Sequence, residues 1–152
     1  PRLSRLSAGF ARAEQPRDLS PVIKLIVREF AGARLDTKQD ADLILPVEPH
    51  AFGVAISNLL RNARTHSDAY APVDVVCGSG RAISIANDGP VIEAHYFHDS
   101  AQNSLRGSTG VGGTGLGLAL VKAVMGESGG TLELRSPRRD SDQGFEARLS
   151  WP

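Results

Sequence analysis

The sequence lacks the residues that build a disulfide scaffold, a thiolate metal cage or a membrane span. Cys77 is its only cysteine, so the chain has no internal disulfide and no cluster of cysteine ligands. No run approaches the roughly 18 to 20 apolar residues of a transmembrane helix, and the first residues lack the pattern of a secretory signal. We therefore expect a soluble protein of a reducing compartment, with Cys77 as a small buried residue of a strand.

The sequence also lacks an excess of charge of either sign. Its 17 Lys and Arg residues balance 17 Asp and Glu residues, so no whole-chain field would draw it to nucleic acid or to an anionic membrane. Any bound phosphate must therefore be held by local groups. With 152 residues, 41% of them hydrophobic, the chain is long enough for one domain with a core and too short for two ordinary domains.

Periodicity along the chain predicts an α/β domain. Apolar residues at helical spacing predict a helix over 49–67 and a further helix with Ser20 as its N-cap and Pro21 at its first position, and residues 115–127 are also expected to be helical, ended by Gly129 and Gly130. Runs with strand character cover 43–45, 73–77, 82–86, 131–136 and 145–151. We expect the second and third of these runs to be neighbouring antiparallel strands. Helices on one face of a mixed sheet would then give a two-layer α/β sandwich.

The first residues indicate a different origin. Leu3, Leu6, Phe10 and Ala13 follow a three-four spacing that predicts a short amphipathic helix, and the residues after them have the composition of a linker. The sequence begins with proline rather than methionine. We therefore expect residues 1–15 to be the end of a preceding helical domain with its linker, and residues 16–152 to form the main domain.

Three segments carry candidate chemistry, and the first lies on the longest predicted helix. Asn58 and Asn62 are four residues apart, so they stand above one another at the edge of the apolar face, and His66 extends the stripe by a turn. Arg61 and Arg64 are expected to point toward water. Amide oxygens at the edge of a core suit a magnesium ion that bridges phosphates, although a partly buried pair that caps nearby backbone is the alternative.

The second segment, Asn87 to Pro90, directly follows a predicted strand. Asp88 offers a carboxylate that can accept a hydrogen bond from the exocyclic amine of a base, and Gly89 lets a ligand approach the backbone. An Asp-Gly-Pro turn is also ordinary loop chemistry, so this segment alone indicates little.

The third segment, Gly110 to Leu118, is rich in glycine and runs straight into an apolar helix. Glycines at a helix entrance leave backbone N–H groups and the positive end of the dipole open to phosphate oxygens, although a merely flexible loop is the alternative. The segment matches the GxGxxG pattern of dinucleotide-binding folds, but the polar residues 102–109 supply no preceding strand, and no GxxxxGK[ST] run exists. Residues 93–113 predict a mobile loop, which we interpret as a lid.

Taken in order, the segments NLLRNARTHS, NDGP and GGTGLGL resemble the asparagine box and the two glycine boxes of the histidine-kinase ATPase family. This superfamily, also called GHKL, includes type II topoisomerase, mismatch-repair and heat-shock chaperone ATPases. The resemblance covers residues 19–152. It implies a sandwich of the Bergerat type, with a mixed, mostly antiparallel sheet, about three helices on one face, a mobile ATP lid, and ATP with Mg²⁺ as ligands.

The resemblance also implies roles for single residues. Asn62 would ligate magnesium, Asn58 would support the metal and phosphate site, and these two would be the catalytic residues, while Asp88 and Gly89 would hold the adenine. Further nucleotide contacts would come from His66, Gly113, Thr114, Gly115, Leu116 and Gly117. In hydrolysing members of the superfamily the position of Asn58 is a glutamate that activates water. Because an amide cannot take a proton at neutral pH, Asn58 favours phosphoryl transfer over hydrolysis.

The function implied is that of the ATP-binding catalytic domain of a bacterial two-component sensor histidine kinase, an ATP-dependent protein-histidine kinase. The phosphoacceptor would lie on a dimerisation and histidine-phosphotransfer domain absent from this sequence, because no histidine precedes His50. The implied partners are that domain and a response regulator, in a homodimeric protein of the inner membrane whose catalytic domain is cytoplasmic. We expect no nucleic-acid partner and no membrane contact by this segment.

Two features of the sequence depart from the family pattern and keep alternatives open. Val91 stands where members usually have a second glycine, and the lid matches the usual phenylalanine- and arginine-containing box poorly, with Tyr96, Phe97 and Arg106 as candidates. One alternative is therefore a degenerate nucleotide-binding regulatory module without efficient transfer. A GHKL-type ATPase is the other.

Overall fold

The computed structural model describes residues 10–65, 67, 71–93 and 115–152. In chain order its elements are β1 (Arg12–Asp18), α2 (Ser20–Glu29), β2 (Ala33–Thr37), β3 (Ile44–Val47), α3 (Pro49–Thr65), β4 (Val73–Gly78), β5 (Ala82–Asn87), α5 (Gly115–Glu127), β6 (Thr131–Arg135) and β7 (Phe145–Ser150).

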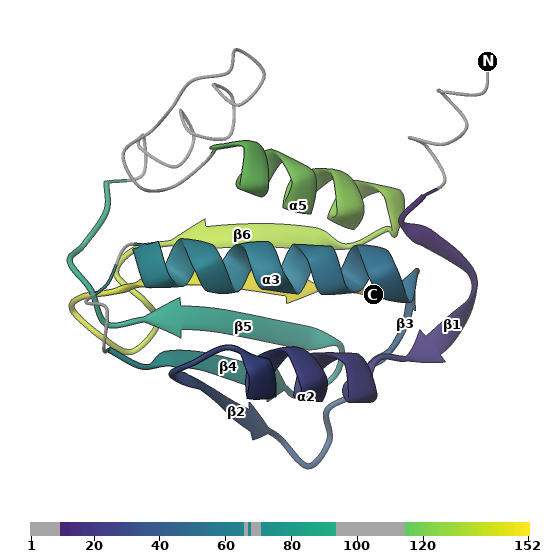
Figure 1. Cartoon of the computed structure of the whole chain (residues 1–152), viewed down its shortest axis with the longest axis horizontal. Helices are drawn as coiled ribbons and strands as arrows, with labels where there is room; N and C mark the ends of the chain where they lie inside the picture. The colour runs from purple at the N-terminus through teal and green to yellow at the C-terminus, as the bar shows by residue number, and fades with distance from the viewer. Residues whose placement is uncertain (1–9, 66, 68–70, 94–114) are drawn as a thin grey trace.

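The described elements form two layers. Five strands make one sheet in the order β2-β4-β5-β7-β6, in which β2 and β4 are parallel and all other neighbours are antiparallel. Helices α2, α3 and α5 lie on one face of this sheet, with α3 in the middle (Figure 1). The predicted sandwich, with its mixed and mostly antiparallel sheet, is confirmed. The predicted lid lies outside the described residues.

The alternation of side chains along the central strands explains why the helices gather on one face. Val73, Val75 and Cys77 of β4 are completely buried, whereas the residues between them are only half-buried on the other face. The predicted burial of Cys77 in a strand is therefore confirmed, and this burial raises the pKa of its thiol.

Among the described residues, no helix has the length and apolar character that crossing a bilayer requires.

Helix α3 supplies the centre of the opposing layer. The residues of its predicted apolar face are each at most 1% exposed: Phe52, Ile56, Leu59 and Ala63. They recur at helical spacing, so one stripe of the helix faces the sheet while its two flanks meet α2 and α5. Burial of this stripe fixes the rotation of α3 and therefore the direction in which its polar residues point.

Two strands differ from the sequence-based expectation. Strand β1 occupies residues that composition assigned to the end of a helix and a linker, and it pairs antiparallel with β3 in a separate two-stranded sheet. Its residues, RAEQPRD, are almost all exposed and carry no alternating pattern. Strand β2, with sequence ARLDT, was not predicted either. The proposed domain boundary after residue 15 falls inside β1, and the assignment of residues 1–15 to a preceding domain stays a prediction.

The predicted start of α2 is displaced by one residue. Leu19 is the N-cap, and Ser20, which we expected to cap the helix, is its first residue, followed by Pro21 as predicted. The N–H group of Ser20 donates instead to the carboxylate of Asp18, with 3.0 Å between nitrogen and Oδ1. The carboxylate of Asp18 therefore accepts a backbone hydrogen bond at the start of α2, which is the role that we expected of the Ser20 hydroxyl.

The loop before β7 depends on a glycine. Gly144 has a φ of +91°, and a Cβ built on it would overlap the carbonyl oxygen of Asn87. Its N–H group donates to the carbonyl oxygen of Gly89 across 2.7 Å. The backbone of this loop is therefore pressed directly against the end of β5.

We expect Gly144→Ala to lower the free energy of unfolding by about 2–4 kcal/mol, because a left-handed backbone and a steric clash act together. Gly80→Ala is the matched control, since Gly80 has a φ of +71° but a Cβ there would meet no atom within 4 Å. It should cost only about 1 kcal/mol. Urea denaturation of both variants measures the difference, and equal losses would contradict the close approach at Gly144.

Candidate functional site

The three chemically suggestive segments meet at one end of the sandwich. Figure 1 shows that the carboxyl end of α3, the end of β5 and the amino end of α5 lie at the same edge, together with the loop that joins β6 to β7. Helices α3 and α5 pack against each other and run in opposite directions. The fold therefore brings the asparagine-bearing helix beside the first turn of the glycine-rich one.

A hollow of about 610 Å³ opens at this edge. It is lined by Thr65, Ser67, Ala71, Asp88, Gly89, Pro90, Ile92 and Gln143. Its size lies within the range of cavities that hold small molecules. At 100° per residue, Asn58 and Asn62 lie on the same stripe of α3 as Thr65, so this stripe leads from the two amides to the hollow.

The two asparagines of α3 have different surroundings. Asn62 is only 8% exposed, and no other residue in the described ranges forms a hydrogen bond with its amide. Asn58 is half-buried and engaged: its amide nitrogen donates to the carbonyl oxygen of Val54 at 2.8 Å, and its oxygen accepts from Arg61 at 3.0 Å. Asn58 thus fits the backbone-bonded alternative, whereas Asn62 is a largely buried residue whose amide oxygen is of the kind that a hard cation takes.

Neither arginine of α3 behaves wholly as expected. Arg61 is exposed, as predicted, but its guanidinium turns back to Asn58. Arg64 does not point toward water: it is half-buried, lies 5.1 Å from the centre of the Phe30 ring and donates to the carbonyl oxygen of Ala31. The correction follows from the packing of α2 against α3, which brings the end of α2 within reach of a long side chain.

Sequence reasoning did not assign a role to Asn87, which the structure places at the centre of the site. Asn87 is completely buried at the end of β5. Its amide nitrogen donates to the carbonyl oxygen of Ala63 at 2.7 Å, and its amide oxygen accepts from the N–H groups of Gly89 and Phe145, each at 3.0 Å. One side chain therefore joins α3, β7 and the turn that carries Asp88.

Asp88 takes part in a chain of charges on the other side of the strand end. Its side chain is 49% exposed, and its Oδ1 accepts from the guanidinium of Arg138 at 3.0 Å. The same nitrogen of Arg138 lies 3.0 Å from Oδ2 of Asp74, whose other oxygen binds Arg34 at 2.7 Å. Four alternating charges thus extend from β2 through β4 and the loop after β6 to the turn after β5.

The middle pair of this chain is electrostatically coupled. Burial raises the pKa of Asp74, but hydrogen bonds from Arg138 and Arg34 outweigh it, so this pKa lies below its ordinary value. Burial lowers the pKa of Arg138, but the hydrogen bond to Asp74 and the nearby charge of Asp88 more than offset it. Both groups therefore stay charged at neutral pH.

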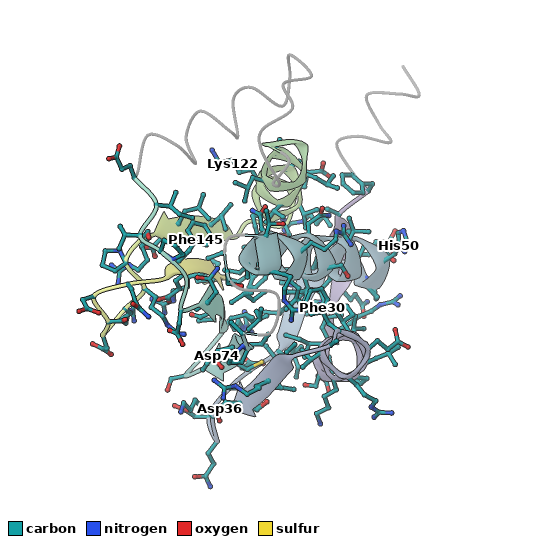
Figure 2. All side chains as sticks on the ribbon, turned by 60° about the vertical axis from the view of Figure 1, so that its left-hand side comes forward. Phe30, Asp36, His50, Asp74, Lys122 and Phe145 are labelled. Atoms are coloured by element: carbon teal, nitrogen blue, oxygen red, sulfur yellow. The ribbon has the colours of Figure 1, made fainter. Side chains whose placement is uncertain are left out.

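The remaining predicted contacts are only partly within the described ranges. Gly115, Leu116 and Gly117 form the first turn of α5, as the glycine-rich segment predicts. His66, Gly113 and Thr114 lie outside the described residues, as do the lid candidates Tyr96, Phe97 and Arg106. At the other end of α3, far from the hollow, His50 is exposed and projects outward (Figure 2).

Residues 48–152 match the family described as histidine kinase-, DNA gyrase B- and HSP90-like ATPases. The chain belongs to this ATPase family. The matched region thus contains the end of α3, the Asp88 turn and the β6–β7 hairpin, which border the hollow, and it also contains α5.

Relatives and solved structures agree with this membership. HK1, a sensor histidine kinase component of Mycobacterium tuberculosis (strain ATCC 25618 / H37Rv), is 29% identical over 139 residues, which cover 88% of this chain and 81% of HK1. The mycobacterial sensor histidine kinase MprB has a TM-score of 0.64 at 22% identity, covering 91% of this chain and 96% of that chain. The crystal structure of full-length ShkA in complex with AMPPNP has a TM-score of 0.69 at 19% identity, and the match covers 98% of this chain and 33% of that chain.

These comparisons confirm the predicted fold and the prediction of an ATP-binding domain of the histidine-kinase type. The two structural likenesses lie below 25% identity and show the fold alone. The chain spans only 40% of the length of another curated relative from Mycobacterium tuberculosis (strain CDC 1551 / Oshkosh), at 28% identity over 155 residues.

We expect Asn87→Ala to lower the free energy of unfolding of the ATPase domain by about 2–4 kcal/mol, because the carbonyl of Ala63 and the N–H of Gly89 would lose a buried partner. Asn58→Ala is the control: it removes an amide of the same size from a half-buried site and should cost less than about 1 kcal/mol. Urea denaturation gives both values. A loss at Asn87 no greater than at Asn58 would show that the amide does not hold these elements together.

The lowered pKa of Asp74 predicts a dependence of stability on acid. Because the folded pKa of Asp74 lies below its ordinary value, the ionised carboxylate contributes stability that is fully present above the unfolded pKa and is lost as the pH falls through the folded pKa. The stability difference between the wild type and Asp74→Asn should therefore be constant above about pH 5 and shrink below about pH 4. Denaturation at a series of pH values measures it, and a difference that does not change with pH would refute the ionic contribution.

Proposed function

We propose that the chain is the catalytic domain of a two-component sensor histidine kinase, which binds Mg-ATP and transfers the γ-phosphoryl group to a histidine on a helical domain outside this sequence. The observation that carries the proposal is the pair of amides on α3, one of them buried beside the site, where a hydrolysing relative would need a carboxylate. The family membership and the sensor-kinase relatives support it.

The residues present suit a magnesium ion and a triphosphate. Asn62 would hold Mg²⁺ through its amide oxygen, because magnesium takes hard oxygen ligands and combines one or two protein groups with phosphate oxygens and water. When bound, the ion neutralises phosphate charge. The first turn of α5, which begins at Gly115, would direct its N–H groups and the positive end of its dipole toward the phosphates.

The described lining of the hollow favours transfer over hydrolysis. Its one carboxylate is that of Asp88, and this carboxylate is bonded to Arg138. Asn58 cannot accept a proton at neutral pH, and its oxygen already accepts from Arg61. With no base placed to activate water among these residues, the reaction would depend on positioning an acceptor that brings its own nucleophile.

Asp88 would recognise the base. Its Oδ1 is held by Arg138, and Asp88 and Gly89 both line the hollow. A carboxylate accepts hydrogen bonds at both oxygens, so the second oxygen would accept from the 6-amino group of adenine. Gly89 would let the ring lie close to the backbone.

The wider setting of this domain is part of the same proposal. Its partners would be the dimerisation and histidine-phosphotransfer domain of the same protein, which would precede β1 in the sequence, and a response regulator. The full-length protein would be a homodimer of the inner membrane, with this domain in the cytoplasm. The proposal is supported by curated relatives that are named as sensor kinases and of which this chain covers only a part.

We expect Asn62→Ala to weaken the binding of ATP in the presence of Mg²⁺ by at least roughly tenfold, which corresponds to about 1.4 kcal/mol, because a metal ligand is lost. Binding in excess EDTA should change by less than about twofold. His50→Ala is the control, since His50 is exposed at the far end of the same helix. Isothermal titration with and without Mg²⁺ measures both, and an equal loss under the two conditions would exclude a metal role for Asn62.

Mixing the chain with the separately produced helical domain of its own full-length protein and labelled ATP tests the transfer itself. The proposal requires phosphohistidine on the helical domain that depends on Mg²⁺ and falls strongly with Asn62→Ala. Tight ATP binding without phosphohistidine would instead favour a regulatory nucleotide-binding module, and steady hydrolysis without an acceptor would favour an ATPase.

A further inference from the structure

We propose that Arg138, in the loop between β6 and β7, is a positioning residue for recognition of the adenine base, because it holds the Asp88 carboxylate in one orientation at the edge of the hollow. The inference rests on the proposed function, in which Asp88 reads the base. Arg138 is 50 residues away from Asp88 in the sequence, and it lies outside all three recognised motifs.

The geometry fixes the guanidinium of Arg138 between two carboxylates. One of its nitrogens lies 3.0 Å from Oδ2 of Asp74 and 3.0 Å from Oδ1 of Asp88. The Arg138 side chain is 20% exposed, against 49% for Asp88. The less exposed group is therefore the arginine, and the carboxylate that borders the hollow is the one it restrains.

Asp74 provides the rigid anchor for this arrangement. It lies within β4, where its backbone is paired with Ala86 of β5 and Arg34 of β2. Its second oxygen is bound by the guanidinium of Arg34, so the carboxylate is held from both sides. Because Asp74 belongs to the sheet, its ion pair with Arg138 fixes the guanidinium relative to the sheet, and the position of Arg138 does not depend on the loop alone.

The same loop also holds the backbone around Asp88. Gln143 donates to the carbonyl oxygen of Asp88 at 3.0 Å, and Gly144 donates to that of Gly89 at 2.7 Å. The hydroxyl of Ser136 accepts from the N–H group of Ile92 at 2.8 Å. The β6–β7 loop thus fixes the turn at its main chain, and Arg138 adds a contact that fixes the orientation of the carboxylate.

A restrained carboxylate binds the base better for two reasons. Its rotation is already limited before the nucleotide arrives, so less conformational entropy is lost on binding. Occupation of Oδ1 by Arg138 also directs the other oxygen to accept a hydrogen bond from an amine. Arg138 would therefore act through Asp88, without touching the nucleotide.

The variants Arg138→Met and Arg138→Lys test this, with Arg139→Met as the matched control. Arg139 is the neighbouring arginine and is exposed, and its backbone N–H donates to Glu146, a contact that survives the substitution. Isothermal titration of the whole chain with Mg-ATP and with Mg-GTP gives the affinities, and thermal denaturation reports on folding. GTP serves as the comparison because guanine carries an oxygen where adenine carries the amine.

We expect Arg138→Met to weaken ATP binding by about three- to tenfold and GTP binding by less than about twofold, so the preference for ATP falls. Arg138→Lys should restore at least half of the lost binding energy, since an ammonium group can still bridge two carboxylates. Arg139→Met should leave both affinities unchanged. In an Asp88→Asn background, Arg138→Met should have no further effect on ATP affinity.

Several outcomes would overturn the inference. Unchanged or tighter ATP binding by Arg138→Met would show that the arginine does not aid the carboxylate. Equal losses for ATP and GTP, or a full effect of Arg138→Met without Asp88, would assign Arg138 a general structural role. Wild-type protein that binds no ATP at all would overturn the proposed function and this inference with it, whereas tight binding that ignores Arg138→Met overturns the inference alone.

Discussion

The buried amide of Asn87 is the interaction on which the geometry of the site depends. It accepts hydrogen bonds from N–H groups of the Asp88 turn and of β7 and donates one to a carbonyl of α3, so a single side chain joins three elements. A buried backbone group without a partner costs about 1–3 kcal/mol, so the amide specifies this arrangement against others in which the core would pack equally well. The position of Asp88 at the edge of the hollow is a consequence of that specification.

The residue after Asn87 completes the site because consecutive side chains of a strand point to opposite faces. Asn87 therefore points toward the helices and is locked by hydrogen bonds in the core, whereas Asp88 points to the other side and is held by Arg138 and, through it, by Asp74. One turn is thus secured from both sides of the sheet. A carboxylate at such a position keeps its charge in contact with solvent while its orientation is set by the protein.

Periodicity predicted the elements that bury one face. Helix α3 and strands β4 to β7 repeat apolar residues at their own period, and α5 is an apolar run bounded by glycines, so these elements could be placed to within a few residues. Strands β1 and β2 could not, because RAEQPRD and ARLDT carry little alternation and their pairing is decided by partners distant in the sequence. Similarly, Asn62 and Asp88 could be recognised within short sequence motifs. Asn87 and Arg138 could not be assigned a role, because each acts through hydrogen bonds to residues 24 to 64 positions away in the sequence.

The hydrogen bonds of Asn58 and Asp88 also affect whether the site would favour phosphoryl transfer or hydrolysis. A site that activates water needs a base close to the phosphates, but α3 has the amide of Asn58 at the position implied for that base, and the oxygen of this amide accepts a hydrogen bond from Arg61. The carboxylate of Asp88, which borders the hollow, accepts a hydrogen bond from Arg138, and Arg138 is itself bound to Asp74 of the sheet. In the proposed kinase, reactivity would therefore come from the geometry with which an incoming histidine meets the phosphate, and the rigid Asp88 turn would contribute by fixing the other end of the nucleotide. Control over the reaction would then lie in domain docking, because the described residues of the nucleotide site include no free base to start it.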